Sequence, residues 1–185
     1  MTELWVVRHG ETEWSANGRH TSHTDLPLTP DGERHVRAVR DRLRGVEFDA
    51  VLTSPRLRAR RTAEIAGFAD AAVDADLVEW DYGEYEGVTT AEIHESVPGW
   101  SVWTNPTPGG ETAAQVAERL DRVIARVRAY PRRVLGFSHG HALRSLAARW
   151  LGEQVAAGRH LQLDTATVSV LGDDRGTPVV VRWNA

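Results

Sequence analysis

Apolar residues along this chain follow two different periods in alternation. Mainly apolar runs of strand length lie at positions 4–7, 48–53 and 134–137. Between them, apolar residues recur every three or four positions, as on one face of a helix. The clearest stripes are Val36, Val39 and Leu43, then Val116, Leu120, Val123 and Val127, and finally Leu143, Leu146, Ala147, Trp150 and Leu151. Alternating strands and helices predict an α/β fold, a three-layer sandwich around a mainly parallel sheet.

Start and turn signals sharpen this pattern. Thr29-Pro30 is typical of an N-cap followed by the first helical position, and Ser54-Pro55 repeats that signal. Near the end of the chain, two runs at 167–171 and 178–183 flank the polar segment 172–176. They are expected either to pair as a hairpin or to form two separate strands.

Composition limits the chemistry that is available. The chain of 185 residues contains no cysteine, which excludes disulfides, zinc–thiolate sites and cysteine nucleophiles. All 22 basic residues are arginine, so a P-loop lysine and a Schiff-base lysine are excluded as well. The length predicts one domain over residues 1–185, and no linker or repeat divides it. Arginine is therefore the only permanently cationic side chain that can hold an anion.

Charge and hydropathy indicate a cytoplasmic protein. The 26 acidic residues outnumber the basic ones, for a formal charge of −4, and no basic stripe favours nucleic acid as a partner. The apolar run behind Met1 stops at Arg8, which is too short for a signal-peptide core or a membrane-spanning helix. No membrane partner is expected, and a homodimer is compatible with the sequence.

Unusual residues stand where the predicted strands end. The first strand leads into Arg8-His9-Gly10, the second into Ser54 with Arg58 one helical turn later, and a third into Ser138-His139-Gly140. Ligands of open α/β sheets bind beyond the carboxyl ends of the strands, so two histidines and two arginines are expected to converge there. Arginine matches the geometry of phosphate, and neutral imidazole is a nucleophile. The set predicts phosphoryl transfer through a phosphohistidine.

A metal site is the main competing interpretation. His20 and His23, or His139 and His141, have spacings compatible with pairs of ligands. We disfavour it because no carboxylate stands at helical spacing and because the arginines beside His9 would repel a cation. The seven tryptophans are expected in the core or in a pocket wall, since no basic groove accompanies them.

Five motifs in order resemble the histidine phosphatase superfamily, whose members are phosphoglycerate mutase-like. They are Arg8-His9-Gly10-Glu11-Thr12 with the following segment to Thr29, Ser54-Pro55-x-x-Arg58, Glu79-Trp80-Asp81-Tyr82-Gly83-x-x-Glu86-Gly87, Gly110-Glu111-Thr112, and Ser138-His139-Gly140. The resemblance implies a phosphoglycerate mutase-like fold. It also implies that no metal and no cofactor are needed.

The resemblance assigns roles to individual residues. His9 would be the nucleophile that becomes phosphorylated, while Arg8, Arg58 and His139 would surround the phosphoryl group. Glu79 matches the general acid, with Asp81 and Glu84 as nearby alternatives. The expected substrate contacts are Arg8, Ser15, Arg19, Thr21, Arg58, Trp80, His139 and Gly140.

Departures from the mutase pattern favour a phosphatase. Ser15 replaces the mutase-type asparagine, Trp80 replaces an arginine, and the usual basic insertion is absent. Residues 96–108, with Trp100 and Trp103, are interpreted either as an aromatic pocket wall or as a loop packed on the domain. The combination is similar to an acid-phosphatase branch of the superfamily.

We therefore expect hydrolysis of small phosphomonoesters, with an acidic pH optimum and a small phosphorylated metabolite as the partner. In this branch the neutral form of the Glu79 carboxyl group is expected to be favoured by Trp80 and by the bound dianion. Three alternatives stay open: a cofactor-dependent phosphoglycerate mutase, a phosphatase of phosphohistidine on proteins, and a catalytically inactive binding module.

Overall fold

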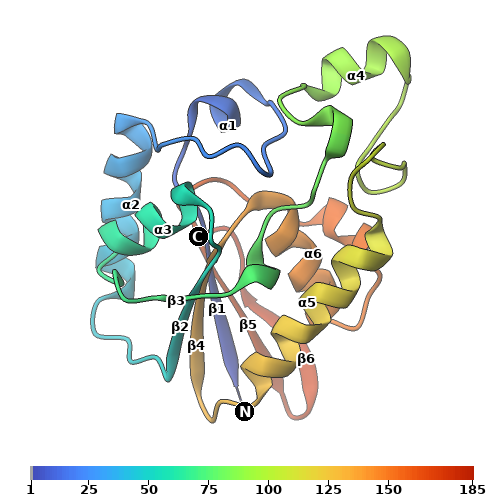
Figure 1. Cartoon of the computed structure of the whole chain (residues 1–185). Coiled ribbons are helices and arrows are strands. Elements are labelled where there is room, and N and C mark those ends of the chain that lie inside the picture. The colour runs from blue at the N-terminus through green and yellow to red at the C-terminus, as the bar shows by residue number, and fades with distance from the viewer. Residues whose placement is uncertain (1) are drawn as a thin grey trace.

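A computed structural model describes residues 2–185 and contains one six-stranded sheet with the order β3-β2-β4-β1-β5-β6 (Figure 1). The strands are β1 (Glu3–Arg8), β2 (Ala50–Thr53), β3 (Ala72–Val73), β4 (Arg133–Ser138), β5 (Val168–Asp174) and β6 (Thr177–Arg182). Adjacent strands from β3 to β1 are parallel, whereas β5 is antiparallel to both of its neighbours. The mainly parallel sheet is thus confirmed.

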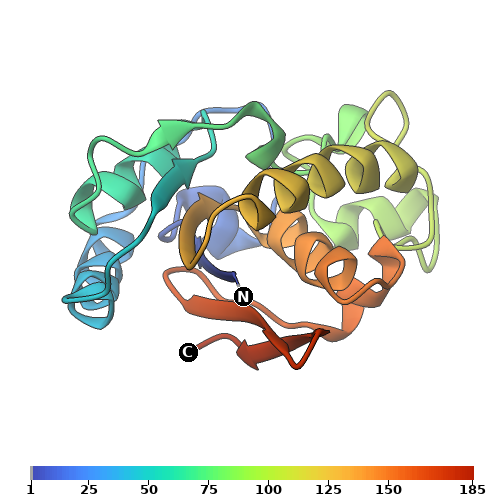
Figure 2. The same ribbon diagram turned by 90° about the horizontal axis from the view of Figure 1, so that it is seen from below.

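Helices cover both faces of the sheet, as the apolar stripes predicted. The helices are α1 (Glu13–Asn17), α2 (Pro30–Leu43), α3 (Leu57–Ile65), α4 (Thr90–Ser96), α5 (Ala113–Arg128) and α6 (Gly140–Trp150). On β1, Val6 belongs to the core cluster that contains the stripes of α5 and α6, and Val7 belongs to the cluster beneath α2 and α3. The two faces alternate because successive side chains of a strand point in opposite directions. Figures 1 and 2 show the resulting three layers.

The late runs form a hairpin, which decides between the two alternatives left by the sequence. Strands β5 and β6 are antiparallel, and Asp174 pairs with Thr177. The two residues between them, Arg175 and Gly176, have φ of 54° and 89°. Positive φ at both central positions is the requirement of a type I′ turn, the connection that matches the twist of a tight hairpin.

The second helix start signal is displaced. Helix α3 begins at Leu57 with Arg56 as its N-cap, and no side chain caps it. The Ser54 hydroxyl is instead directed to His139, as described below. Three short elements, α1, α4 and β3, were not predicted, because five-to-seven-residue helices and a two-residue strand leave too few positions for a periodic pattern. Among the described residues, no helix combines the length and the apolar character needed to cross a bilayer.

Candidate active site

Three adjacent strands bring the predicted residues together at one edge of the sheet. Strand β4 lies between β1 and β2, and Arg8 of β1 is in register with Ser138 of β4. The residues that follow these strands, His9 and His139, have ring centroids 5.2 Å apart. Strand order therefore converts three distant sequence segments into one cluster.

His9 is held in the tautomer that a nucleophile needs. Its Nδ1 lies 2.7 Å from the carbonyl oxygen of Gly10. A carbonyl only accepts, so Nδ1 carries the proton and Nε2 of the neutral ring keeps its lone pair. Burial, together with the charges of Arg58 and Arg8, holds the pKa of His9 well below its usual value of 6.5. The ring consequently remains neutral in mildly acidic solution.

The turn behind His9 is fixed by close packing at Gly10. Its amide donates to the Thr62 hydroxyl at 2.9 Å, which ties the turn to α3. A Cβ at this position would lie 2.8 Å from Val36 Cγ2 and 3.0 Å from the carbonyl of Gly32. Only glycine fits here without moving α2, and the direction of the His9 ring follows from this contact.

Arg8 presents its guanidinium beside His9. One end donates from Nη1 to the carbonyl of Leu163, while Nε is buried without a hydrogen-bond partner within residues 2–185. A Cβ on Gly140 would approach the guanidinium to 3.3 Å, so glycine leaves room for it at the start of α6. Arg8 is part of the cavity wall, so its positive charge lies in the same cavity as His9.

Arg58 and His139 lie behind the open part of the cluster. Arg58 is fully buried, and its Nε donates to Nδ1 of His139 at 3.1 Å. Its other nitrogens donate to the carbonyls of Thr21 at 3.0 Å and Thr24 at 3.1 Å. His139 Nε2 in turn lies 2.7 Å from the Ser54 hydroxyl. These donors are engaged within the protein, and neither residue is part of the cavity wall. Their direct contact with a phosphoryl group stays a prediction.

Glu79 occupies the N-terminus of α6. Its carboxylate accepts from the amides of His141 at 3.1 Å and Ala142 at 2.7 Å, and from Trp80 N–H at 2.8 Å. It thereby caps a helix whose N-cap residue makes no side-chain cap bond. This position puts the carboxylate in the same cavity as His9. The alternatives differ: Asp81 pairs with His23 at 3.0 Å and Glu84 is exposed, and neither lines the cavity.

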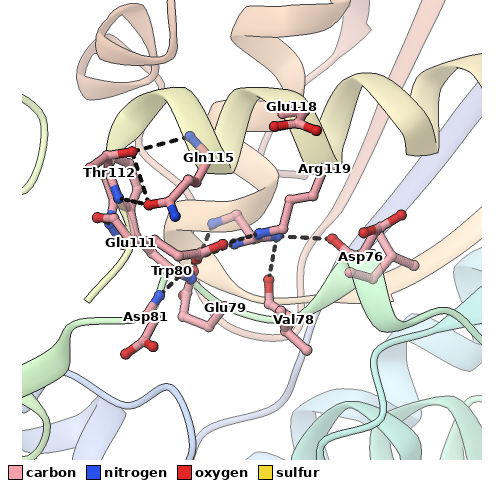
Figure 3. A network of polar contacts seen from close by, with 12 residues as sticks. Asp76, Val78, Glu79, Trp80, Asp81, Glu111, Thr112, Gln115, Glu118 and Arg119 are labelled. Atoms are coloured by element: carbon pink, nitrogen blue, oxygen red, sulfur yellow. Dashed lines mark hydrogen bonds and ion pairs between the residues drawn. The ribbon is translucent and has the colours of Figure 1, made fainter. Parts of the chain in front are cut away.

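A buried ion pair holds the segment that carries Glu79 (Figure 3). Arg119 of α5 binds the Glu111 carboxylate through Nε at 2.7 Å and Nη2 at 3.0 Å. Its Nη1 donates to the carbonyls of Asp76 and Val78, both at 2.9 Å, and Glu111 accepts from the amide of Asp81 at 2.9 Å. The chain is thus fixed on both sides of Glu79.

The cavity has a volume of about 250 Å³ and contains most of the predicted contacts. Predicted residues in its wall are Arg8, His9, Ser15, Arg19, Thr21, Glu79 and Gly140. Sequence reasoning missed His20, Tyr82 and His141 as wall residues, and it did not identify Arg144 or Leu163 at all. Arg144 had one usable signal, since a polar residue one turn after Gly140 interrupts the apolar face near the site. Leu163 had none, because it acts through a backbone carbonyl.

The tryptophan predictions need correction. Trp80 does not line this cavity: its indole N–H donates to the Glu111 carbonyl at 3.0 Å, and its ring packs edge-on against Trp103. Its ring therefore lies outside the cavity that contains the Glu79 carboxylate, in contrast to the expected pocket between Trp80 and the bound phosphate. Trp100 is buried in the core, and its ring packs edge-on against His20 with 5.3 Å between the ring centroids. Residues 96–108 pack on the domain: Trp100 is buried in the core, and the partly buried ring of Trp103 packs against Trp80 and His141.

The histidine pairs considered for metal binding have other partners. His20 Nδ1 lies 2.7 Å from the carbonyl of Val88, whereas His23 contacts Asp81 and Arg56. Across residues 2–185, no three histidine, aspartate or glutamate side chains are grouped so that they could bind a metal ion.

Comparison with known proteins agrees with the fold. Residues 4–185 match the histidine phosphatase superfamily (branch 1). An acid phosphatase of Mycobacterium tuberculosis is 41% identical over 177 residues, which cover 94% of this chain and 87% of that protein. Sedoheptulose 1,7-bisphosphatase of Saccharomyces cerevisiae is 39% identical over 180 residues, covering 80% of this chain and 66% of that enzyme.

The solved structure of the protein from the open reading frame Rv3214 of M. tuberculosis superposes with a TM-score of 0.95 at 39% identity, covering 99% of this chain and 97% of the other. The family match spans nearly the whole chain. The chain therefore belongs to the histidine phosphatase superfamily, branch 1.

Proposed function

We propose that this protein is a phosphatase that hydrolyses small phosphomonoesters through a phosphohistidine at His9. The observation that carries the proposal is the state of that residue: a neutral, buried imidazole whose Nε2 lone pair is available in a cavity that also contains the Glu79 carboxylate. The similarity to an acid phosphatase and to a bisphosphatase supports the same reaction class.

The proposed reaction has two steps that use the same residues in opposite directions. In the first, His9 Nε2 attacks phosphorus, the bond from phosphorus to the ester oxygen breaks, and Glu79 gives its proton to the leaving oxygen. In the second, water attacks the phosphohistidine, Glu79 takes the proton of that water, and the phosphorus–nitrogen bond breaks. The enzyme returns to its starting state, with phosphate and an alcohol as products.

The arginines supply the electrostatic part of the mechanism. Arg8 lines the cavity beside His9, where its positive charge would stabilise the phosphoryl oxygens as charge develops on them. Arg58 lies outside the cavity wall. Together with burial, its positive charge lowers the pKa of both His9 and His139. An acidic pH optimum is part of the proposal, and it is compatible with His9, because burial and the neighbouring arginines hold the pKa of that ring well below 6.5 and leave the nucleophile unprotonated in mildly acidic solution.

The test is a panel of phosphate esters assayed for phosphate release at several pH values, with phosphoglycerate included as a substrate and as a phosphoryl acceptor. We expect release of phosphate, and we expect rapid quenching with labelled substrate to place the label on His9. The variant His9→Ala should keep its fold and lose turnover. Transfer to phosphoglycerate without release of phosphate would establish a mutase instead, and near-normal turnover by His9→Ala would refute the mechanism.

A further inference from the structure

Two histidines that the proposed chemistry does not use form part of the cavity wall. The rings of His20 and His141 are parallel to within 7°, with centroids 6.3 Å apart. His20 precedes Thr21 in the loop after α1, and His141 lies in the first turn of α6. Both therefore line the same cavity as His9 and Glu79.

The protonation of His20 follows from its partner. Nδ1 lies 2.7 Å from the Val88 carbonyl, which can only accept, so Nδ1 carries the hydrogen. In a neutral imidazole the other nitrogen, Nε2, is then an acceptor.

His141 is held in the opposite tautomer. Its Nδ1 lies 2.6 Å from the hydroxyl of Tyr82, which is buried and has no other hydrogen-bond partner in residues 2–185. Burial raises the pKa of Tyr82 well above 10, so the phenol keeps its proton and donates it to Nδ1. Burial also lowers the pKa of His141 well below 6.5, so the ring is neutral. The remaining hydrogen of His141 must be on Nε2, which is a donor.

Both Nε2 atoms are available to a ligand. Within the part of the chain that the structure describes, neither has a hydrogen-bond partner, and neither is among the polar side-chain atoms sealed from solvent. The cavity thus presents one donor and one acceptor on stacked rings. Hydroxyl groups of Ser15, Thr21 and Thr90 line the same space.

An alcohol is the functional group that fits such a pair. A hydroxyl accepts from one nitrogen and donates to the other, whereas a carboxylate or a second phosphate only accepts and an ammonium group only donates. We infer that His20 and His141 form a hydroxyl-recognition subsite that selects phosphate esters of polyols or sugars. The reaction of such esters rests on the proposed phosphatase function, but their recognition does not.

Binding tests the inference separately from turnover. At pH 7.5, calorimetric titration compares 3,4-dihydroxybutylphosphonate with butylphosphonate, two non-hydrolysable ligands that differ only in their hydroxyl groups. We expect the diol to bind at least about 10-fold more tightly, as two added hydrogen bonds of ordinary strength would give. Equal affinities would overturn the inference.

Variants test whether His141 is responsible for the tighter binding of the dihydroxylated phosphonate. His141→Phe keeps an aromatic ring against Trp103 but removes the donor, and the affinity ratio should fall to about 1–2. His35→Phe, a matched change at an exposed position of α2, should leave the ratio at its wild-type value. A ratio that survives in His141→Phe would overturn the assignment. If that variant does not fold, long-range nitrogen–proton NMR of the wild type decides: a proton on His141 Nδ1 rather than Nε2 would refute the inference.

Turnover separates the two proposals. With glycerol 3-phosphate and butyl phosphate as substrates, the hydroxylated ester should have the higher kcat/KM. Cleavage of both at equal kcat/KM, together with equal phosphonate affinities, would overturn the subsite and leave the phosphatase standing. Selective phosphonate binding without hydrolysis of any ester would overturn the phosphatase and leave the subsite standing.

Discussion

Glu79 is a carboxylate surrounded by backbone donors, yet the proposed reaction requires it to carry a proton at the start of each cycle. Three amide hydrogens point at its two oxygens. When Glu79 carries the proton, one of its oxygens can no longer accept from all of these amides. Its hydrogen bonds to the backbone must therefore change as the proton passes to the leaving group. Its importance should depend on how poor the leaving group is.

We expect Glu79→Gln to slow hydrolysis of an alkyl phosphate by about 10²–10⁴-fold, the range for loss of a general acid, and to slow nitrophenyl phosphate far less. Steady-state kinetics with the two substrates measure this. The matched control Glu84→Gln changes an exposed carboxylate outside the cavity and should alter neither rate. Equal slowing of both substrates in Glu79→Gln would assign the proton donor elsewhere.

Arg58 positions neighbouring groups of the site through its hydrogen bonds and its charge. Its donors bind His139 and the carbonyls of Thr21 and Thr24, and its charge depresses the pKa of His9. We expect Arg58→Ala to reduce kcat/KM by about 10²-fold, the scale for a small misplacement of reacting groups, because His139 and the carbonyls of Thr21 and Thr24 lose their donor. Lysine should restore only part of this, because it lacks the forked geometry.

In Arg58→Ala, the pH at which His9 becomes protonated should also rise, since a positive neighbour has been removed. The acidic limb of the kcat/KM profile measures it. An unchanged rate and an unchanged acidic limb would remove Arg58 from the site.

At the scale of elements, the site depends on how α5 is joined to the segment before α4. Arg119 is 5% exposed and lies on the buried face of α5, and its contacts with Glu111, Asp76 and Val78 fix the chain on both sides of Glu79 (Figure 3). Removing one partner of such a pair leaves the other charge uncompensated in a poorly solvated place.

We expect Arg119→Met to lower the free energy of unfolding by about 3 kcal/mol and to slow alkyl phosphates more than aryl phosphates, because Glu79 loses its position. Urea unfolding and the two-substrate assay, run well below the Tm of the variant, measure these effects. Arg122→Met on the same helix removes only half-exposed ion pairs and should lower the free energy of unfolding much less. A variant that is less stable but has an unchanged ratio of alkyl to aryl rates would show that the pair is structural only.

For the whole molecule, burial of three neutral histidines makes the free energy of unfolding depend on pH. The pKa values of His9, His139 and His141 all lie well below 6.5 in the folded protein. In the unfolded chain they return to about 6.5. Below that pH the unfolded state binds protons that the native state does not, so stability falls as pH falls.

The unfolding free energy should therefore be highest above pH 7 and should decrease between about pH 6.5 and 5.5, by up to about 1.4 kcal/mol per pH unit for each histidine. Urea unfolding at closely spaced pH values measures the slope. His141→Phe should reduce that slope, and His35→Gln, at an exposed position, should not. A flat profile over this interval would mean that the three rings are not buried in the neutral form.

Several parts of the molecule were determined by the sequence itself. The stripes of α2, α5 and α6 and the runs of β1 and β4 predicted those elements because local periodicity reflects which face is buried. The residues at the strand ends identified His9 and His139 as neighbours, since parallel strands bring their carboxyl ends to one edge. The motif order was specific enough to identify the family.

Only the tertiary structure decided what these side chains contact. Trp80 adjoins Glu79 in sequence but faces away from the cavity, while Leu163 and Arg144, which belong to no motif, form part of its wall. The donors of Arg58 are engaged by carbonyls more than thirty positions away. Side-chain direction and long-range hydrogen bonds depend on how distant segments pack, and local sequence carries no signal for that packing.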